Sequence, residues 1–390
     1  MDAKARNALT KLLEAGDRMT AGVRSTPPAL TRSQLADYQA TRSLADKEAF
    51  EAAMKAARAE GAVALTWEKG LGEEGFIQRV ELIDLDALAK LLGVETAASR
   101  LERATAQLAD LLTAFPVLKD VLARWASLKK VRTYGPEDAQ DWADAARVIQ
   151  FMTSARENRT VDEPIREVSA GLFKDSKRIE KLAAPVDVLL TSDVDPEPRE
   201  AHDVWQEIGL FREEQPVRMA GRVVVSRTRV TDLLDEPYGA FSAPSVIGLA
   251  SQPKLLMTIE NQTTFHSEAR RRCDEDILLI YTAGMPTPAW RALYVRLLKG
   301  LPPEVPVYHF GDIDEGGFRI AAILALDAQS AGHILQPWKM HPDDVPEDRR
   351  VEASKHTLER IRRFASAAGW DELGREVAKA GFTVEQEALR

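Results

Sequence analysis

The segment VPVYHFGDIDEGGFRIAAIL, residues 305–324, places Asp312 and Asp314 directly after an apolar run. Residues two apart on an extended backbone point to the same side, so both carboxylates are expected to project into one place. Carboxylates held close together repel each other, and one takes up a proton unless a cation neutralises the pair. Clustered carboxylate oxygens suit a hard ion such as Mg²⁺ or Mn²⁺, so the spacing predicts a metal site. The alternative is a solvated turn at the end of a strand.

A third acid, Glu260, stands at the end of the apolar run in KLLMTIEN, residues 254–261. If that run is a strand of the same sheet, Glu260 lies at the same rim as Asp312. Gly311, Gly316 and Gly317 flank the aspartates and let backbone or substrate come close. The helix expected after them offers its positive end to a phosphate. Capping of the next helix is the structural alternative for Glu260.

The C-terminal part of the chain, from about residue 244, alternates apolar strands with helices, as a parallel sheet covered on both faces requires. The pattern predicts strands at 254–261, 276–284, 305–312 and 333–340, and helices at 263–273, 288–301 and 316–328. Ligands of such sheets bind at the carboxyl ends of the strands, where the three acids are expected.

The N-terminal part reads as a helix over 1–24 followed by a helix over 43–62, in which Ser43 and Asp46 form a capping-box pattern. Strands at 62–67 and 76–83 and a short helix at 84–93 follow. A helix followed by a hairpin is the skeleton of a winged helix, which binds either DNA or another protein. The loop GLGEEG (70–75) matches a dinucleotide-binding motif in letters alone, because a strand and not a helix comes after it.

The middle of the chain looks helical over 96–130 and 136–158, and PVDVLLTSDVDPEP (185–198) is interpreted as a strand followed by a proline-rich turn. These patterns predict a helical arm (1–30), a winged-helix-like domain (31–95), a mostly helical connection (96–195) and a C-terminal α/β domain (196–390). The N-terminal part is therefore expected to be α+β.

The composition is that of a globular protein, with 45% hydrophobic and 29% charged residues. No run of apolar residues is long enough for a transmembrane helix, and the N-terminus lacks the features of a signal peptide. Cys273 is the single cysteine, which excludes an internal disulfide and favours a reducing cytoplasm. The net charge of −9 argues against non-specific coating of nucleic acid, but a locally basic channel remains compatible with it.

Two stretches are locally basic and are candidates for contacts with DNA phosphates, although solvated surface faces would look the same. They lie at 124–132 and 215–231, and the candidate residues in them are Lys129, Lys130, Arg218, Arg222, Arg227 and Arg229. The chain has no G-x-S-x-G, G-x-x-x-x-G-K-[ST] or H-E-x-x-H motif, so neither a serine hydrolase, a P-loop nucleotide site nor a zinc protease is indicated.

A strand-end glutamate followed by D-x-D two strands later in a small parallel sheet resembles the Toprim domain of topoisomerases, primases and several nucleases. The segments IENQTTF (259–265), FGDIDEGGFRI (310–320), LFKDSKRIEKL (172–182) and FTVEQEAL (382–389) together resemble the JetD family, the nuclease subunits of bacterial Wadjet defence systems. That family in turn resembles the A subunit of type IIB topoisomerases, with an N-terminal arm, a winged helix and a C-terminal Toprim domain.

The resemblance implies a DNA endonuclease dependent on Mg²⁺ or Mn²⁺ that cleaves circular plasmids. It matches Glu260, Asp312 and Asp314 to the Toprim acids. Glu385 and Glu387 near the C-terminus are further candidates for metal ligands or for groups around the ligands, and a charged helix end is the alternative for both. Implied partners are double-stranded DNA, a second copy of the chain and an SMC-like motor complex of SMC, kleisin and KITE-type subunits.

One departure from the topoisomerases concerns the nucleophile, because no tyrosine stands in a convincing pattern. Tyr38 and Tyr134 are the two candidates, and ordinary packing explains each of them. Hydrolysis by metal-activated water is the simpler expectation. The alternatives are a strand-cleaving subunit with a covalent tyrosine and a non-catalytic DNA-binding adaptor.

Overall fold

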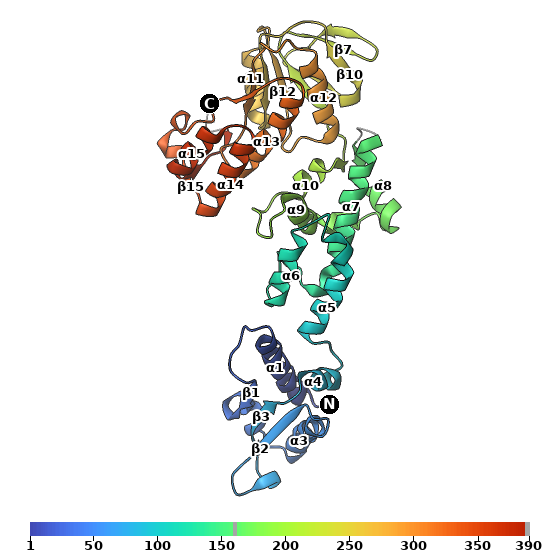
Figure 1. The fold of residues 1–390 in the computed structure, drawn as a ribbon, viewed down its shortest axis with the longest axis vertical. Coiled ribbons are helices and arrows are strands. Elements are labelled where there is room, and N and C mark those ends of the chain that lie inside the picture. The colour runs from blue at the N-terminus through green and yellow to red at the C-terminus, as the bar shows by residue number, and fades with distance from the viewer. Residues whose placement is uncertain (159–161, 387–390) are drawn as a thin grey trace. The chain divides into compact units, whose positions relative to one another are not determined.

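The computed structural model describes residues 1–158 and 162–386 of the protein (Figure 1). The chain divides into two compact units, each built from two stretches of sequence. The first unit comprises Met1–Ala146 and Val188–Pro196, and the second comprises Arg147–Asp187 and Glu197–Arg390. In the described residues, no helix combines the length and the apolar character needed to cross a membrane.

The first unit begins with helices around a three-stranded antiparallel sheet of strand order β1-β3-β2. The elements in chain order are α1 (Ala3–Thr20), β1 (Ala29–Thr31), a 3₁₀ helix (Arg32–Leu35), α2 (Ala36–Gln39), α3 (Leu44–Ala59), β2 (Val63–Trp67), a 3₁₀ helix (Gly72–Glu74), β3 (Ile77–Leu82) and α4 (Leu85–Leu92). The predicted helix at 43–62 and the two strands after it are confirmed. Its cap is also present, since Ser43 accepts a hydrogen bond from the Asp46 backbone N–H at 3.3 Å.

One hydrophobic core holds these N-terminal elements together. Leu9 and Leu12 of α1 belong to the same cluster as Met54 of α3, Ile77 of β3 and Leu88 of α4, and all five side chains are fully buried. Burying each such side chain stabilises the fold by roughly 1.5–3 kcal/mol. Helix α1 is therefore an integral part of this core.

The rest of the first unit is helical. It contains α5 (Ala97–Leu108), a 3₁₀ helix (Ala109–Leu111), α6 (Leu118–Ala126), a 3₁₀ helix (Pro136–Asp138) and the first part of α7 (Ala139–Asn158). Trp125 and Trp142 are fully or nearly fully buried, and their rings meet edge to face at 6.1 Å between centroids. The helical prediction for this region is confirmed.

The strand predicted within 185–198 is wrong, because residues Ala183–Thr191 form helix α9. Val186, Val188 and Leu189 are buried in it, and its backbone bonds begin with the Val186 N–H donating to the Leu182 carbonyl. A short run of apolar residues occurs both in buried helices and in buried strands, so the hydrophobic periodicity could not distinguish the two.

The second unit is organised around a six-stranded sheet of order β14-β13-β11-β12-β6-β9. Strands β14, β13, β11 and β12 are parallel, while β6 and β9 extend the sheet in antiparallel fashion. The elements of this α/β part are β6 (Val217–Ala220), β9 (Gly239–Phe241), β11 (Leu256–Ile259), α11 (Gln262–Arg271), β12 (Leu278–Tyr281), α12 (Pro288–Lys299), β13 (Val307–Phe310), α13 (Glu315–Ser330) and β14 (Leu335–Pro337). All four parallel strands and all three helices between them were predicted, and they are confirmed.

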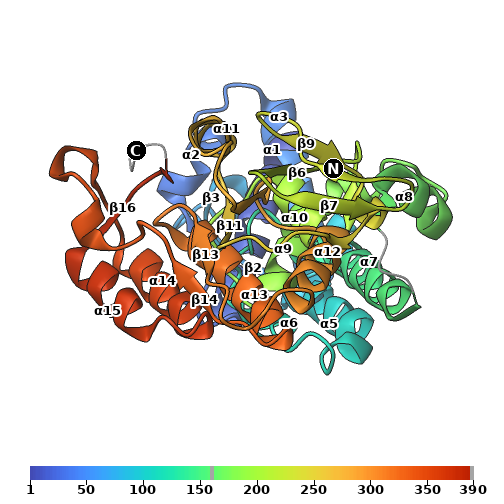
Figure 2. The ribbon, with the colours of Figure 1, turned by 90° about the horizontal axis from the view of Figure 1, so that it is seen from above.

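The connections of the parallel strands reverse direction at β11. The chain passes from β11 to its neighbour β12, then crosses back over β11 to β13 and continues to β14. Right-handed crossovers place α11 on one face of the sheet and α12 with α13 on the other. Figure 2 shows α11 and α13 on opposite sides of β11 and β13, and α12 packs against α13. The carboxyl ends of β11 and β13 therefore form a topological switch point, where ligands bind in open α/β sheets.

The remaining elements of the second unit surround this sheet. They are β4 (Glu163–Pro164), α8 (Ile165–Phe173), a 3₁₀ helix (Ile179–Lys181), α10 (Ala201–Glu207), β5 (Leu210–Phe211), the small sheet of β7 (Val224–Arg227), β8 (Thr231–Leu233) and β10 (Val246–Leu249), short 3₁₀ helices at Ala243–Ser245, Pro342–Asp344 and Glu347–Arg349, and β15 (Val351–Glu352), α14 (Lys355–Ala367), α15 (Asp371–Ala380) and β16 (Phe382–Thr383). Helix α14 packs against both α13 and α15, so the C-terminal helices are attached to the sheet through α13.

Candidate metal-binding active site

The switch point brings together the acids predicted from the sequence. Ile259 of β11 pairs with Phe310 of β13, so Glu260 leaves its strand opposite Gly311, one residue before Asp312. The Glu260 backbone N–H donates to the Phe310 carbonyl at 3.0 Å and extends the ladder by one step. Glu260 and Asp312 are thus held next to each other by strand pairing between segments about 50 residues apart in sequence.

The Glu260 side chain turns toward the aspartates. Its Oε2 accepts a hydrogen bond from the Asp312 backbone N–H at 3.1 Å. Burial raises the pKa of Glu260 well above its ordinary value, and the nearby charges of Asp312 and Asp314 raise it further. The charged form of Glu260 is therefore destabilised by burial and by repulsion from Asp312 and Asp314. A bound cation would relieve that repulsion.

Asp314 is directed partly toward its own helix. It is the N-cap residue of α13, and its Oδ1 accepts from the Gly317 backbone N–H at 2.7 Å. Burial raises the pKa of Asp314, while the bonds to backbone N–H groups oppose that rise. The second aspartate therefore orients the helix start as well as adding charge to the site.

Two glycines are required by this packing. A Cβ on Gly311 would lie 2.6 Å from Nε2 of His309 and 2.8 Å from Oε2 of Glu260. A Cβ on Gly317 would lie 2.2 Å from the Asp312 carbonyl oxygen. The predicted close approach is therefore confirmed, and the groups that approach are parts of the site itself.

Gly317→Ala is expected to distort the loop that carries the aspartates. Because the added methyl overlaps the Asp312 backbone, we expect a loss of about 1–3 kcal/mol in the free energy of unfolding, measured by urea denaturation. Gly171→Ala in helix α8 is the matched control, since nothing lies within 4 Å of its added Cβ. Unchanged stability in Gly317→Ala would contradict the packing described above.

A pocket of about 530 Å³ opens at this point, and Glu260, Asp312 and Asp314 all line it. Five further acids line it too: Glu315, which directly follows Asp314, and Glu197, Glu200, Asp203 and Glu385 from other segments. The pKa of Glu197 is raised by burial and then by the charges of Glu315 and Asp314. The pocket is thus strongly acidic, and most of this surplus was not evident from the sequence because these acids follow no recognisable motif.

Of the two weaker candidates at the C-terminus, Glu385 lies on the rim of this pocket and is exposed. Glu387 lies outside the described residues. Gln386, between these two glutamates, was not predicted from the sequence as a site residue. It is fully buried and contacts both strand ends of the site. A polar residue in a charged C-terminal stretch carries no local signal for such a position.

A buried network of charges supports one wall of the pocket. Arg319 of α13 donates to both carboxylate oxygens of Glu207 at 2.8 and 2.9 Å, and Arg199 donates to Glu207 and to Asp187 at 2.7–2.8 Å. Although burial raises it, the charges of Arg319 and Arg199 bring the pKa of Glu207 below its ordinary value. The two arginines are engaged by these carboxylates, so they fix α10 against α13.

His309, inside strand β13, is fully buried, and its Nδ1 lies 2.9 Å from the Thr258 hydroxyl. Burial lowers its pKa to about 3, which keeps the ring neutral. His309 therefore has a specific partner on strand β11, the neighbour of its own strand.

The donor set fits Mg²⁺ or Mn²⁺ by its chemistry, because it consists of carboxylate oxygens, which are the ligands that these hard cations prefer. The three predicted acids are spread along the pocket, so their ligand atoms do not all lie within 4.8 Å of one another. Among residues 1–158 and 162–386, one group of three metal-capable side chains meets that distance. It consists of Glu236, Cys273 and Asp274, elsewhere on the surface. Mg²⁺ is commonly held by one or two carboxylates together with water and substrate phosphate, so Glu260 and Asp312 are the residues that would hold such an ion here.

The pH dependence of stability offers a test of the Glu260 environment. The folded chain keeps the Glu260 proton to higher pH than the unfolded chain, so its contribution makes the free energy of unfolding fall as pH rises above the ordinary glutamate pKa. In EDTA, we expect Glu260→Gln to remove part of that fall in calorimetric scans between pH 4 and 8. Identical pH profiles for both proteins would contradict the assigned charge environment.

The basic candidates are distributed over both units. Arg222 is ion-paired with Asp276 at 2.6 Å, and Lys130 is ion-paired with Glu137 at 3.0 Å. Two others stack on aromatic rings within the second unit: Arg218 lies over Tyr281 and Arg227 over Phe241. Lys129 and Arg229 are exposed. None of the six lines the acidic pocket.

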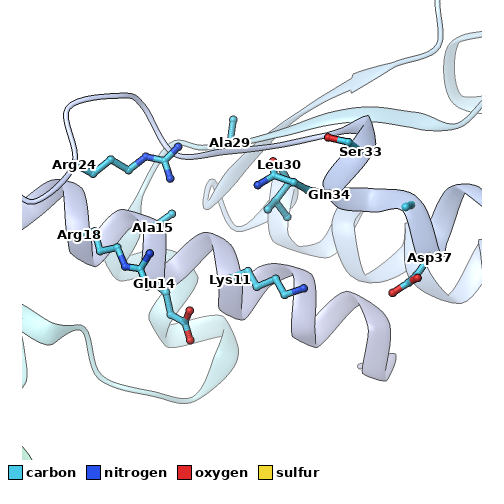
Figure 3. A pocket seen from close by; sticks show the side chains of 11 residues that line it. Lys11, Glu14, Ala15, Arg18, Arg24, Ala29, Leu30, Ser33, Gln34 and Asp37 are labelled. Carbon is cyan, nitrogen blue, oxygen red and sulfur yellow. The ribbon is translucent and has the colours of Figure 1, made fainter.

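A second hollow, of about 450 Å³, lies in the first unit between helix α1 and the segment of β1 and the 3₁₀ helix after it (Figure 3). Its charged lining is mixed. The cations Lys11, Arg18 and Arg24 are accompanied by the acids Glu14 and Asp37. This hollow lacks the surplus of one charge that distinguishes the acidic pocket.

Two family models and one known protein match parts of this chain. The family model described as the C-terminal part of Wadjet protein JetD matches residues 218–390, which contain all three acids. A second model, described as the N-terminal part of an uncharacterised protein conserved in bacteria, matches residues 3–191. Wadjet protein JetD of Bacillus cereus (strain Q1) is 29% identical over 206 residues, which are 47% of this chain and 46% of that protein. Residues 218–390 are thus similar to the C-terminal part of Wadjet protein JetD, and the match with the Bacillus cereus protein points to the same family.

Proposed function

We propose that this protein is a DNA endonuclease that depends on Mg²⁺ or Mn²⁺ and acts as the nuclease subunit of a Wadjet-type defence complex. The observation that carries the proposal is the acidic pocket at the switch point, where Glu260 bonds the backbone of Asp312 and has a strongly raised pKa. If the protein acts on phosphodiesters, a cation is required between the carboxylates of the pocket and the negatively charged phosphate.

Glu260 and Asp312 would hold the divalent ion, with Asp314 and Glu385 at the edges of the same pocket. Such an ion supplies Lewis-acid stabilisation of charge on the scissile phosphate and makes water a better nucleophile. Glu260 would serve either as a further ligand of the ion or as the general base that accepts a proton at a carboxylate oxygen. The N-terminal end of α13, which reaches the pocket through Glu315 and Gly316, is oriented to favour a phosphate.

We further assign the sheet around β11 and β13 to the Toprim domain, supported by the acids at the switch point. The first three α-helices and the β1-β3-β2 sheet follow the order helix, strand, helix, helix, strand, loop, strand, which supports a winged helix that begins with α1. The exposed face of α3 carries Asp46, Glu48, Arg58 and several alanines, so it is not a basic surface.

Hydrolysis is favoured over a covalent tyrosine mechanism by the surroundings of Tyr38. Its ring is 2% exposed, and its hydroxyl donates to Glu51 at 2.6 Å while accepting from the Ile77 backbone N–H at 3.0 Å. Burial and the Glu51 carboxylate raise the pKa of Tyr38 far above its ordinary value, which is the reverse of what a nucleophile needs.

The Wadjet relationship supports a role beside an SMC-like motor with kleisin and KITE-type subunits, and circular plasmids as the double-stranded substrate. We propose a homodimer, because one acidic pocket per chain provides for one strand and two chains provide for both.

The test is cleavage of supercoiled plasmid by the purified chain, with and without the motor subunits, in Mg²⁺, Mn²⁺ or EDTA. The proposal expects nicked or linear product with either metal and none in EDTA. Product that stays covalently attached to protein after denaturation would favour the tyrosine mechanism. Absence of any metal-dependent cutting with the complete complex would favour a non-catalytic adaptor.

A further inference from the structure

The C-terminal strap, defined as residues Phe382–Gln386, runs across the loop that carries the two aspartates. It begins in β16, where Phe382 pairs with Glu352 of β15. Two residues later, Val384 exchanges both backbone hydrogen bonds with Ile313, the residue between the aspartates, at 2.9 and 3.1 Å. The strap therefore adds a short antiparallel contact to a loop that would otherwise leave the sheet unsupported.

The side chain of Gln386 then reaches the ends of both strands of the switch point. Its Nε2 donates to the Phe310 carbonyl at 2.8 Å, and its Oε1 accepts from the Asn261 backbone N–H at 2.7 Å. The side chain is fully buried. One carboxamide thus bridges β13 and the residue that follows Glu260.

This bridge lies where the strand ladder ends. The last main-chain bond between the two strands runs from the Glu260 N–H to the Phe310 carbonyl, and the N–H of the following residue, Asn261, donates to Gln386. A carboxamide has the same donor and acceptor as a peptide group, so Gln386 adds a side-chain bridge between the two segments just beyond that bond. The spacing of the backbone at Glu260 and Asp312 is fixed on both sides as a result.

The backbone of Gln386 also contacts an acid directly. Its N–H donates to Oδ1 of Asp312 at 2.5 Å, which is a charge-assisted bond of the stronger kind. The same stretch of chain places Glu385 on the pocket rim. The strap therefore orients one predicted acid and contributes another.

We propose that Gln386 is a positioning residue of the acidic pocket, and that the pocket reaches its cation-binding geometry only when the strap is docked. This inference rests on the proposed metal-dependent function. Gln386 holds Glu260 and Asp312 in register through the backbone and touches neither substrate nor ion. Groups that orient metal ligands in this way change affinity by roughly 10- to 100-fold when removed.

The test compares the full-length chain with Gln386→Met, which keeps the length and buried volume but removes both side-chain hydrogen bonds. Mn²⁺ binding is measured by calorimetry, and the binding assigned to the pocket is the part that Asp312→Asn abolishes. We expect Gln386→Met to weaken that binding about 10-fold or more. We also expect faster hydrogen exchange in peptides spanning 259–263 and 310–314, measured in EDTA. Gln329→Met, at an exposed position near the end of α13, is the matched control and should change neither quantity.

Gln386→Asn tests whether the length of the side chain matters when its chemistry is kept. Asparagine has the same carboxamide, but its side chain is one methylene shorter and cannot span both strand ends. It should resemble Gln386→Met, and it serves as the milder variant if the methionine protein does not fold. Mn²⁺ affinity and hydrogen exchange equal to wild type in either folded variant would overturn the inference while leaving the proposed function in place. Absence of Mn²⁺ binding by the wild-type chain would overturn both.

Discussion

Asp312→Asn is expected to lower the rate of Mg²⁺-dependent plasmid cleavage by about 10³-fold or more. The substitution keeps the size of the side chain and its bond from the Gln386 N–H, but it removes the charge that would share the ion with Glu260. Loss of several kcal/mol of transition-state stabilisation corresponds to that factor. The measurement is a time course of supercoiled plasmid conversion by the complete complex at saturating metal.

The control for this prediction is Glu304→Gln, an exposed carboxylate in the loop before β13. It should cut at the wild-type rate. DNA binding by Asp312→Asn, measured by mobility shift in EDTA, should equal that of the wild-type chain, because the predicted DNA contacts lie outside the pocket. Full cleavage activity in Asp312→Asn would remove the pocket from the reaction.

Glu207→Ala is expected to lower the free energy of unfolding of the second unit by about 3–5 kcal/mol. Arg319 is 5% exposed and donates to both oxygens of Glu207, so the truncation leaves a buried guanidinium without that partner. Arg199 keeps Asp187, which places the expected effect toward the lower end of the range. Differential scanning calorimetry and urea unfolding measure the change.

The matched control is Glu376→Ala, which removes a carboxylate from a half-exposed contact with His341 in the same unit. Exposed ion pairs contribute at most about 1 kcal/mol, so this variant should unfold almost as the wild type does. Because the pKa of Glu207 is lowered in the folded chain, its stabilising contribution is present above the ordinary glutamate pKa and is lost as pH falls. Equal destabilisation by the two substitutions would argue against a structural role for the buried network.

The pairing of Glu260 with Asp312 was accessible from sequence because it depends on a general rule. Parallel strands end at one edge of a sheet, and both acids directly follow apolar runs of strand length. Asp314 was predicted less completely. The spacing placed it beside Asp312, but an aspartate at the start of a helix can also be the N-cap residue. In the structure, Asp314 caps α13 by accepting a hydrogen bond from the Gly317 N–H.

Other parts of the site had no local signal. Asp203 enters the pocket because α10 and α13 pack together through Glu207 and Arg319, which is a tertiary effect. Gln386 reaches strands that are 76 and 125 residues away in sequence. The helix at Ala183–Thr191 was mistaken for a strand because burial on several sides makes the two patterns alike.

Binding of a divalent cation in the acidic pocket is tested most directly by the anomalous scattering of Mn²⁺ in crystals of the wild-type chain soaked with that ion. We expect a peak in the pocket, roughly 2 Å from carboxylate oxygens of Glu260 and Asp312. The peak should disappear in crystals of Asp312→Asn. A peak confined to Glu236, Cys273 and Asp274, or a pocket without any peak at a Mn²⁺ concentration that supports cleavage, would contradict the account.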